Sequence, residues 1–178
     1  ASGARAMEEL TTQTKSVLEG QGTIPHVFTH QIAFNLLPEI DVFLANGYTR
    51  EEWKVVEETR RLLHTPDLSI AITCVRVPVY VGHSQVINVD FERPMAPDEA
   101  RYILAHSPGV KVIDDPSVSL YPQPWTAAGT DDVFVGRIRS DASNPSGLAL
   151  WVVADNLRKG AALNAIQIAE EAVKLGIL

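Results

Sequence analysis

The sequence predicts an α+β fold in which helices lie on one face of a mixed, mostly antiparallel sheet. Apolar residues recur at helical spacing in four segments, and short β-branched runs lie between them. Their order is helix, helix, two strands, helix, three strands and helix, which is typical of an α+β layered domain. The predicted helices are 4–19, 50–65, 97–106 and 157–175, and the predicted strands are 70–77, 86–91, 110–113, 133–138 and 148–153.

The first helix carries an apolar stripe that includes Met7, Leu10 and Val17, and glycines at 20 and 22 end it. Ser2 and Gly3 precede this helix. Their presence is compatible with a plain N-cap and also with a phosphate or amide contact at a helix N-terminus.

Residues 24–47 show no sustained period and contain Pro25 and Pro38, so we expect irregular structure with a short strand or helical turn around 32–37. His26 and His30 have the spacing of two helical metal ligands. Proline precedes them and no carboxylate is near, so no metal site is expected.

The second helix has a clear start, because Thr49-Arg50-Glu51-Glu52 fits a capping box. Pro66 forces its end. Glu51 and Lys54 are three residues apart and share one side of the first turn. Residue pattern alone allows either a solvated pair or a functional pair.

Arg76 is the unusual residue of the strand predicted at 70–77, because its neighbours require burial and a buried guanidinium requires an anion. His83 follows seven residues later, about 23 Å away along an extended chain. Pro78 and Gly82 predict a bend that brings His83 back toward Arg76. The two side chains would then offer a cation for a carboxylate and a group that transfers a proton near neutral pH.

The remaining segments complete the fold. Pro97-Asp98-Glu99 predicts the first turn of the third helix, and 114–130 is predicted to be a long functional or interfacial loop. Asp155 or Asn156 caps the closing helix. Alanines on several faces of that helix indicate packing against a second domain or subunit.

Composition excludes several classes of protein. The chain has 178 residues, 46% of them hydrophobic and 21% charged, a net charge of −7 and no cluster of Lys or Arg, so neither nucleic acid nor an anionic membrane is expected as a partner. No membrane span or signal peptide is predicted, and a cytoplasmic location is expected. The single cysteine, Cys74, excludes an internal disulfide and is interpreted as a buried structural thiol.

Seven blocks of the sequence carry a resemblance to a known family: SGARAMEEL (2–10), FNLLPEIDVF (34–43), YTREEWKVVEETRRLL (48–63), CVRVPVYVGHS (74–84), FERPMAPDEAR (91–101), VFVGRIRSD (133–141) and GLALWVVADNLRKGAALNAIQIAE (147–170). These blocks extend over nearly the whole chain. They resemble the carboxy-terminal part of the aspartate-β-semialdehyde dehydrogenases.

The resemblance implies a domain like the C-terminal domain of glyceraldehyde-3-phosphate dehydrogenase. Residues 1–155 would form a substrate-binding and dimerisation domain, and 156–178 a helix that packs on an NADP-binding domain. The family reductively dephosphorylates L-aspartyl-4-phosphate to L-aspartate-4-semialdehyde with NADPH, through a cysteine thioester, on the route to lysine, methionine and threonine. A homodimer is expected, and a further pairing of dimers stays open.

By matching motifs, the resemblance also implies roles for individual residues. His83 would be the acid/base, and Arg76 would bind the substrate α-carboxylate. Glu51 would bind the substrate amino group and Lys54 the phosphate. Ser2, Gly3 and Asn156 would contact NADP.

Two features of the family have no counterpart in these residues: the glycine-rich nucleotide-binding half and the nucleophilic cysteine, which Cys74 does not match. We therefore expect part of a longer enzyme that does not catalyse the reaction alone. Two alternatives are a non-catalytic scaffold or binding module of the same fold, and a related N-acetylglutamyl-phosphate reductase. The EExK helix start and the RVPVYVGH pattern disfavour the reductase.

Overall fold

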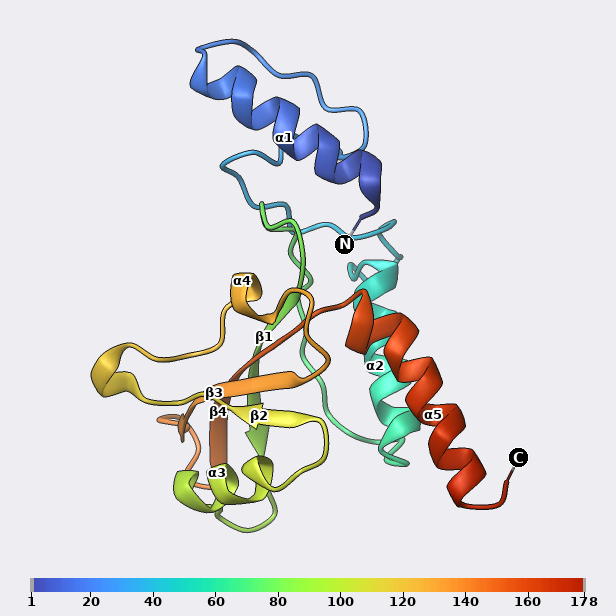
Figure 1. Ribbon diagram of the computed structural model, residues 1–178, viewed down its shortest axis with the longest axis vertical. Coiled ribbons are helices and arrows are strands. Elements are labelled where there is room, and N and C mark those ends of the chain that lie inside the picture. The colour runs from blue at the N-terminus through green and yellow to red at the C-terminus, as the bar shows by residue number, and fades with distance from the viewer. Residues whose placement is uncertain (1, 178) are drawn as a thin grey trace. The chain divides into compact units, whose positions relative to one another are not determined.

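The computed structural model describes residues 2–177 as two compact units, which we treat one at a time (Figure 1). The first unit is Ser2–Pro78 and the second comprises residues 79–177. Residues 1 and 178, the ends of the two domains predicted from the sequence, lie outside the described residues. None of the helices within 2–177 is both long and apolar enough to cross a membrane.

The first unit contains two helices, α1 (Ala4–Leu18) and α2 (Arg50–Leu62), as predicted. The irregular structure predicted for 24–47 is confirmed, and it is organised around a small core. Leu10 of α1 packs there with Ile32, Ala33 and Leu37. The short strand expected around 32–37 is reduced to one bridge, between Leu37 and Arg76.

Two polar side chains of α1 fix this irregular segment. The carboxylate of Glu9 accepts hydrogen bonds from the backbone N–H groups of His26 (3.1 Å) and Val27 (2.6 Å). The side-chain oxygen of Gln13 accepts bonds from Ile32 N (2.8 Å) and Ala33 N (3.2 Å). These side chains therefore supply the acceptors that a loop without regular structure needs for its backbone donors.

The prediction of a strand at 70–77 is wrong. Its side chains do alternate, with Ile70, Ile72, Cys74 and Arg76 half-buried and the residues between them exposed. Yet among the described residues this segment pairs with another only at Arg76, which exchanges backbone bonds with Leu37. Alternating burial of side chains indicates an extended chain, whereas a β-strand must also pair with an adjacent strand along its length.

The second unit is built on a four-stranded sheet in the order β1-β4-β3-β2. β1 (His83–Asp90) and β3 (Val133–Ser140) run antiparallel to β4 (Gly147–Ala154), and β2 (Val110–Val112) runs parallel to β3. The predicted mixed, mostly antiparallel sheet is thus confirmed, and β1 starts three residues before its predicted position.

The helix α3 (Pro97–Ala105) covers one face of the sheet, and Asp98 and Glu99 lie in its first turn as predicted. Its Ala100 packs on Val135, Ile138 and Leu148. On the other face, Phe134 and Val153 pack against Ala127 of the single-turn helix α4 (Pro124–Ala127). α4 belongs to the predicted long loop, together with the 3₁₀ turn η1 (Pro116–Val118).

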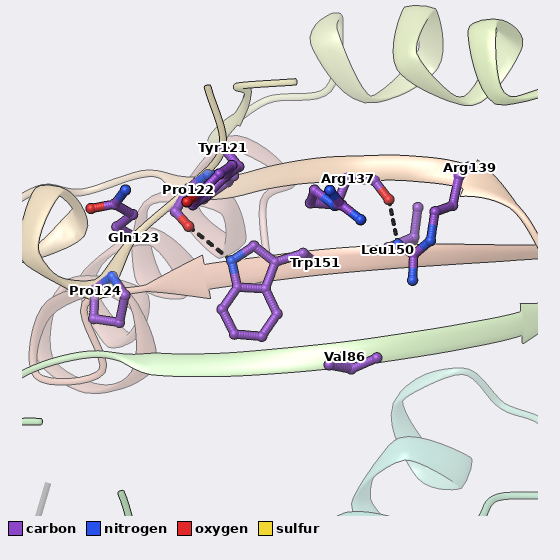
Figure 2. A pocket seen from close by; sticks show the side chains of 9 residues that line it. All are labelled: Val86, Tyr121, Pro122, Gln123, Pro124, Arg137, Arg139, Leu150 and Trp151. Carbon is purple, nitrogen blue, oxygen red and sulfur yellow. Dashed lines mark hydrogen bonds between the residues drawn. The ribbon is translucent and has the colours of Figure 1, made fainter. Parts of the chain in front are cut away.

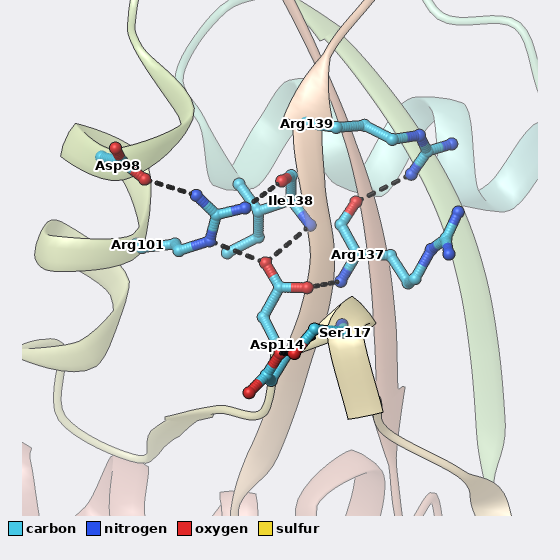
Figure 3. Close-up of polar contacts among 8 residues, drawn as sticks. Asp98, Arg101, Asp114, Ser117, Arg137, Ile138 and Arg139 are labelled. Carbon is cyan, nitrogen blue, oxygen red and sulfur yellow. Dashed lines mark hydrogen bonds and ion pairs between the residues drawn. The ribbon is translucent and has the colours of Figure 1, made fainter. Parts of the chain in front are cut away.

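A β-bulge interrupts β3 at Arg137, whose φ is 53°. The buried carboxylate of Asp114 accepts hydrogen bonds from Arg137 N (2.6 Å) and Ile138 N (3.1 Å) and forms an ion pair with Arg101 Nε at 2.7 Å (Figure 3). The hydrogen bond to Asp114 is the main cause that raises the pKa of the Arg101 guanidinium above its usual range. The bulge resets the alternation of β3, so that Ile138 faces the core and Arg139 the opposite side.

The closing helix begins with the π-helical turn η2 (Arg158–Ala162) and continues as α5 (Leu163–Lys174). Asp155 is its cap, because its Oδ1 accepts bonds from Leu157 N (2.8 Å) and Arg158 N (3.2 Å). No residue of α5 is buried, and Ile166 and Ile168 are both more than half exposed.

Candidate active site

The start of α2 places Glu51 and Lys54 at the surface of the first unit. The predicted capping box is present: Thr49 Oγ1 accepts a bond from Glu52 N (3.3 Å), and Thr49 N donates to Glu52 Oε2 (2.6 Å). Lys54 Nζ lies 3.5 Å from the Glu51 carboxylate, and both side chains are more than a third exposed. The pair is therefore solvated and weakly coupled, and both charges are accessible to a ligand.

Glu52 differs from Glu51, because it is 6% exposed and uses both of its carboxylate oxygens. Oε1 accepts a bond from the backbone N–H of Cys74 at 2.8 Å. The hydrogen bond from Thr49 N is the main cause that lowers the pKa of Glu52, against the opposing effect of burial. Glu52 is thus a buried, ionised contact between the start of α2 and the extended segment that carries Arg76.

Arg76 is half-buried and lies two residues beyond that contact. Its backbone is fixed by two bonds to Leu37, with N–O distances of 2.8 and 3.1 Å. Within residues 2–177, no carboxylate forms an ion pair with its guanidinium, so the anion expected for Arg76 is not supplied by this part of the chain.

Cys74 shares the neighbourhood of these charges and is half-buried rather than fully buried. Burial, followed by the negative charges of Glu52 and Glu51, raises the pKa of its thiol, while Arg76 acts in the opposite sense. A thiol with a raised pKa is a poor nucleophile at neutral pH. The charges of Glu51, Glu52 and Arg76 therefore all act on the sulfur atom of Cys74.

His83 and Asn156 both belong to the second unit, near the start of β1. His83 is exposed and pairs with Ala154, the last residue of β4. Asn156 lies two residues beyond Ala154, and its Oδ1 accepts a bond from the backbone N–H of Gly82 at 3.0 Å. Gly82 has φ +100°, as the bend predicted before His83 requires, while the predicted approach of His83 to Arg76 stays a prediction.

Asp155 holds the backbone beside Asn156 in place. It is 3% exposed, and besides capping the closing helix it accepts a bond from Gly129 N through Oδ2 at 2.7 Å. Burial would raise its pKa, but the hydrogen bonds from Gly129, Leu157 and Arg158 lower it overall. An ionised, buried carboxylate thus fixes the point at which the sheet leads into the closing helix.

Ser2 and Gly3 precede α1 in the first unit. Gly3 is the cap residue, with φ 88°, and no side chain caps the helix. The predicted cap segment Ser2-Gly3 thus does precede the helix, with Gly3 as the cap and no capping hydrogen bond from a side chain. The first backbone N–H groups of α1 have no side-chain acceptor at the cap and point toward any anion or amide bound there.

The structure thus brings the predicted residues together in two groups. Glu51, Lys54 and Arg76 belong to the first unit, as do Ser2 and Gly3, and His83 and Asn156 belong to the second. Sequence reasoning missed Glu52 beyond its capping role, since a bond that spans 22 residues leaves no local pattern. The described residues contain no cluster of three or more His, Cys, Asp or Glu side chains suited to a metal ion.

The second unit thus presents a histidine at the start of a strand of a mixed sheet, and the first unit presents a half-buried arginine together with a glutamate and a lysine at its surface. The family model described as "Semialdehyde dehydrogenase, dimerisation domain" matches residues 1–159, and the chain belongs to this family.

Its relatives are aspartate-semialdehyde dehydrogenases. The protein of that name from Aquifex aeolicus is 52% identical over 178 residues, which cover 99% of this chain and 52% of the relative. The protein from Bacillus subtilis is 45% identical over 184 residues, covering 99% and 53%. The chain thus spans about half the length of the curated relatives it matches.

Solved structures agree with this assignment. Aspartate semialdehyde dehydrogenase II from Vibrio cholerae, complexed with ASA, has a TM-score of 0.91 at 42% identity and covers 97% of this chain and 51% of its own. The enzyme from Candida albicans, solved with NADP, has a TM-score of 0.68 at 24% identity over 97% of this chain and 57% of its own, a likeness of fold.

Proposed function

We propose that this chain is the substrate-binding and dimerisation part of an aspartate-semialdehyde dehydrogenase. The reaction is the reductive dephosphorylation of L-aspartyl-4-phosphate to L-aspartate-4-semialdehyde with NADPH. The observation that carries this proposal is that Glu51 and Arg76 both act electrostatically on Cys74, with Lys54 3.5 Å from Glu51, within a family whose Vibrio cholerae member was solved with ASA. The cytoplasm is the proposed location, and a single unpaired cysteine suits it.

Each charged group of the first unit suits one part of this substrate. Within residues 2–177, Arg76 forms no ion pair, and it can present its planar fork to the α-carboxylate. Glu51 carries the negative charge that an α-ammonium group requires. Lys54 is a flexible point charge suited to the phosphate. Binding of substrate would exchange the weak pair between Glu51 and Lys54 for two oppositely charged ligand groups.

His83 is the proposed acid/base of the reaction. It is exposed at the start of an ordered strand, so its ring is accessible while its backbone is fixed by pairing with β4. In the oxidative direction it would accept the hydroxyl proton of the thiohemiacetal as that adduct is oxidised to the thioester, and in the reductive direction it would return that proton.

Ser2, Gly3 and Asn156 are proposed to contact NADP. The uncapped N-terminus of α1 offers backbone N–H donors, and Asn156 has its Oδ1 engaged by Gly82, which leaves its NH₂ group to donate to a carboxamide. When bound, the cofactor supplies the hydride. Exposed apolar residues on α5 support the proposal that 156–178 pack on a cofactor domain while 1–155 bind substrate and dimerise.

The 178-residue chain alone is expected to show no phosphate-dependent NADP reduction with aspartate semialdehyde, because its only thiol, Cys74, has a raised pKa. The full-length enzyme that contains this sequence should form NADPH, followed by absorbance, only when aldehyde and phosphate are both present. The Aquifex aeolicus enzyme is the positive control. Turnover by the pure chain, or none by the full-length enzyme, would contradict the proposal.

We propose that two copies meet through the sheet face that carries Val86 and Trp151. The family is a dimerisation domain, and this face has a hollow of about 450 Å³ that is lined by apolar side chains and by Arg137 and Arg139 (Figure 2). Trp151 lies in the middle of the hollow and donates a hydrogen bond from Nε1 to Pro122 O at 2.8 Å. Val86 is 68% exposed on an edge strand. Assembly into a dimer of dimers stays a prediction.

Val86→Glu should weaken self-association of the chain by about 100-fold, because a two-fold interface buries the residue twice and a carboxylate resists burial. Sedimentation velocity over a range of concentrations measures this. Gln85→Glu is the matched control, since the next residue of the strand is also exposed but points to the other face. If both variants associate as tightly as the wild type, another surface forms the dimer.

A further inference from the structure

Glu52 has more contacts than a capping box requires. The box uses its Oε2, which accepts a bond from Thr49 N at 2.6 Å. Its Oε1 accepts the bond from Cys74 N at 2.8 Å, and the carboxylate is almost fully buried. One ionised side chain therefore joins the first turn of α2, which carries Glu51, to the segment that carries Arg76.

That segment depends on the contact because it has no neighbouring strand. Among the described residues, 70–77 is fixed by hydrogen bonds at two points: Cys74 N to Glu52, and Arg76 to Leu37. Two residues along an extended chain span about 7 Å, and side chains at i and i+2 lie on the same side. Cys74 and Arg76 thus share the side that is partly buried, and loss of the Glu52 bond would free the backbone next to Arg76.

We infer that Glu52 is a positioning residue for substrate binding: it sets the place of Arg76 relative to Glu51, so that the α-carboxylate and the α-ammonium group of one amino acid are bound together. The inference rests on the proposed function of Arg76 and Glu51. A carboxylate suits this task because it offers one oxygen to each of the two backbone donors. Glutamine at the same position has a single carbonyl oxygen and would leave one of those buried N–H groups without an acceptor.

Kinetics of the full-length enzyme test this role. Glu52→Gln should raise KM for aspartate semialdehyde about 10-fold, with a much smaller change in kcat, because the binding groups move while the acid/base does not. Thr49→Ala is the matched control: it removes the hydroxyl that caps Glu52 N but leaves both acceptor oxygens of Glu52 in place. It should change KM by less than about two-fold.

A double-mutant cycle separates positioning from general destabilisation. If Glu52 acts through Arg76, then Glu52→Gln combined with Arg76→Lys should raise KM no further than Arg76→Lys alone. The inference would be overturned if the two substitutions together raised KM by the product of their separate effects. It would also be overturned if Glu52→Gln lowered kcat and thermal stability at constant KM. An unchanged KM in Arg76→Lys alone would instead reject the proposed role of Arg76.

Cys74 provides a second readout in the 178-residue chain, independent of activity. It is the only thiol, so the rate of alkylation by iodoacetamide reports its environment without ambiguity. Glu52→Gln should speed alkylation at neutral pH at least about three-fold, because it removes a negative charge and a bond to the Cys74 backbone. Thr49→Ala should not. Equal rates in the wild type and in Glu52→Gln would mean that the contact is absent, and would overturn the inference.

Discussion

Replacing His83 by asparagine is expected to lower kcat of the full-length enzyme by about 10²–10⁴-fold while leaving KM for aspartate semialdehyde nearly unchanged. Asparagine keeps a polar side chain of similar size but cannot accept or release a proton in this pH range. The backbone at this position is fixed by the pairing of β1 with Ala154 of β4, so the substitution should not displace the neighbouring strand.

The pH profile tells a lost proton transfer from a lost contact. Histidine is the side chain that titrates near neutral pH, so kcat/KM of the wild type should show a limb there that is absent from His83→Asn. Ser84→Ala is a suitable control, since it alters the next exposed residue of the same strand. Turnover within about two-fold of the wild type, with the limb retained, would exclude His83 as the acid/base.

Features that depend on local sequence were predicted well. The capping box at Thr49 was found because its two bonds join residues three apart, and the bend before His83 because Gly82 permits a positive φ. The strands of the second unit were found from β-branched alternation. In each case a few consecutive residues contain the physical cause of the structure.

Features that depend on distant partners were not predicted. Residues 70–77 have the alternation of a strand but lack a neighbour, and no local pattern reports whether a neighbour exists. The bulge at Arg137 depends on Asp114, which lies 23 residues earlier, so no local pattern indicates either role. In the candidate site, residue types and their motif could be found, but the link from Glu52 to Cys74 could not.

Replacing Arg76 by lysine is expected to raise KM for aspartate semialdehyde by about 10²-fold, with a smaller effect on kcat. Lysine keeps the positive charge but loses the planar fork that binds both carboxylate oxygens at once. The loss is larger because Arg76 is half-buried and its backbone is fixed by the bonds to Leu37. The chain therefore cannot move to bring the lysine ammonium group closer to the carboxylate.

The substrate itself supplies the decisive comparison for Arg76. With an aldehyde of the same length that lacks the α-carboxylate, Arg76→Lys and wild type should have similar kcat/KM, because the fork has nothing to bind in either enzyme. Arg61→Lys, an exposed arginine on α2, should leave kinetics with both aldehydes unchanged. If Arg76→Lys impairs the two aldehydes equally, the guanidinium does not bind the carboxylate. The anion that a half-buried arginine requires would then have to be sought in another part of the substrate.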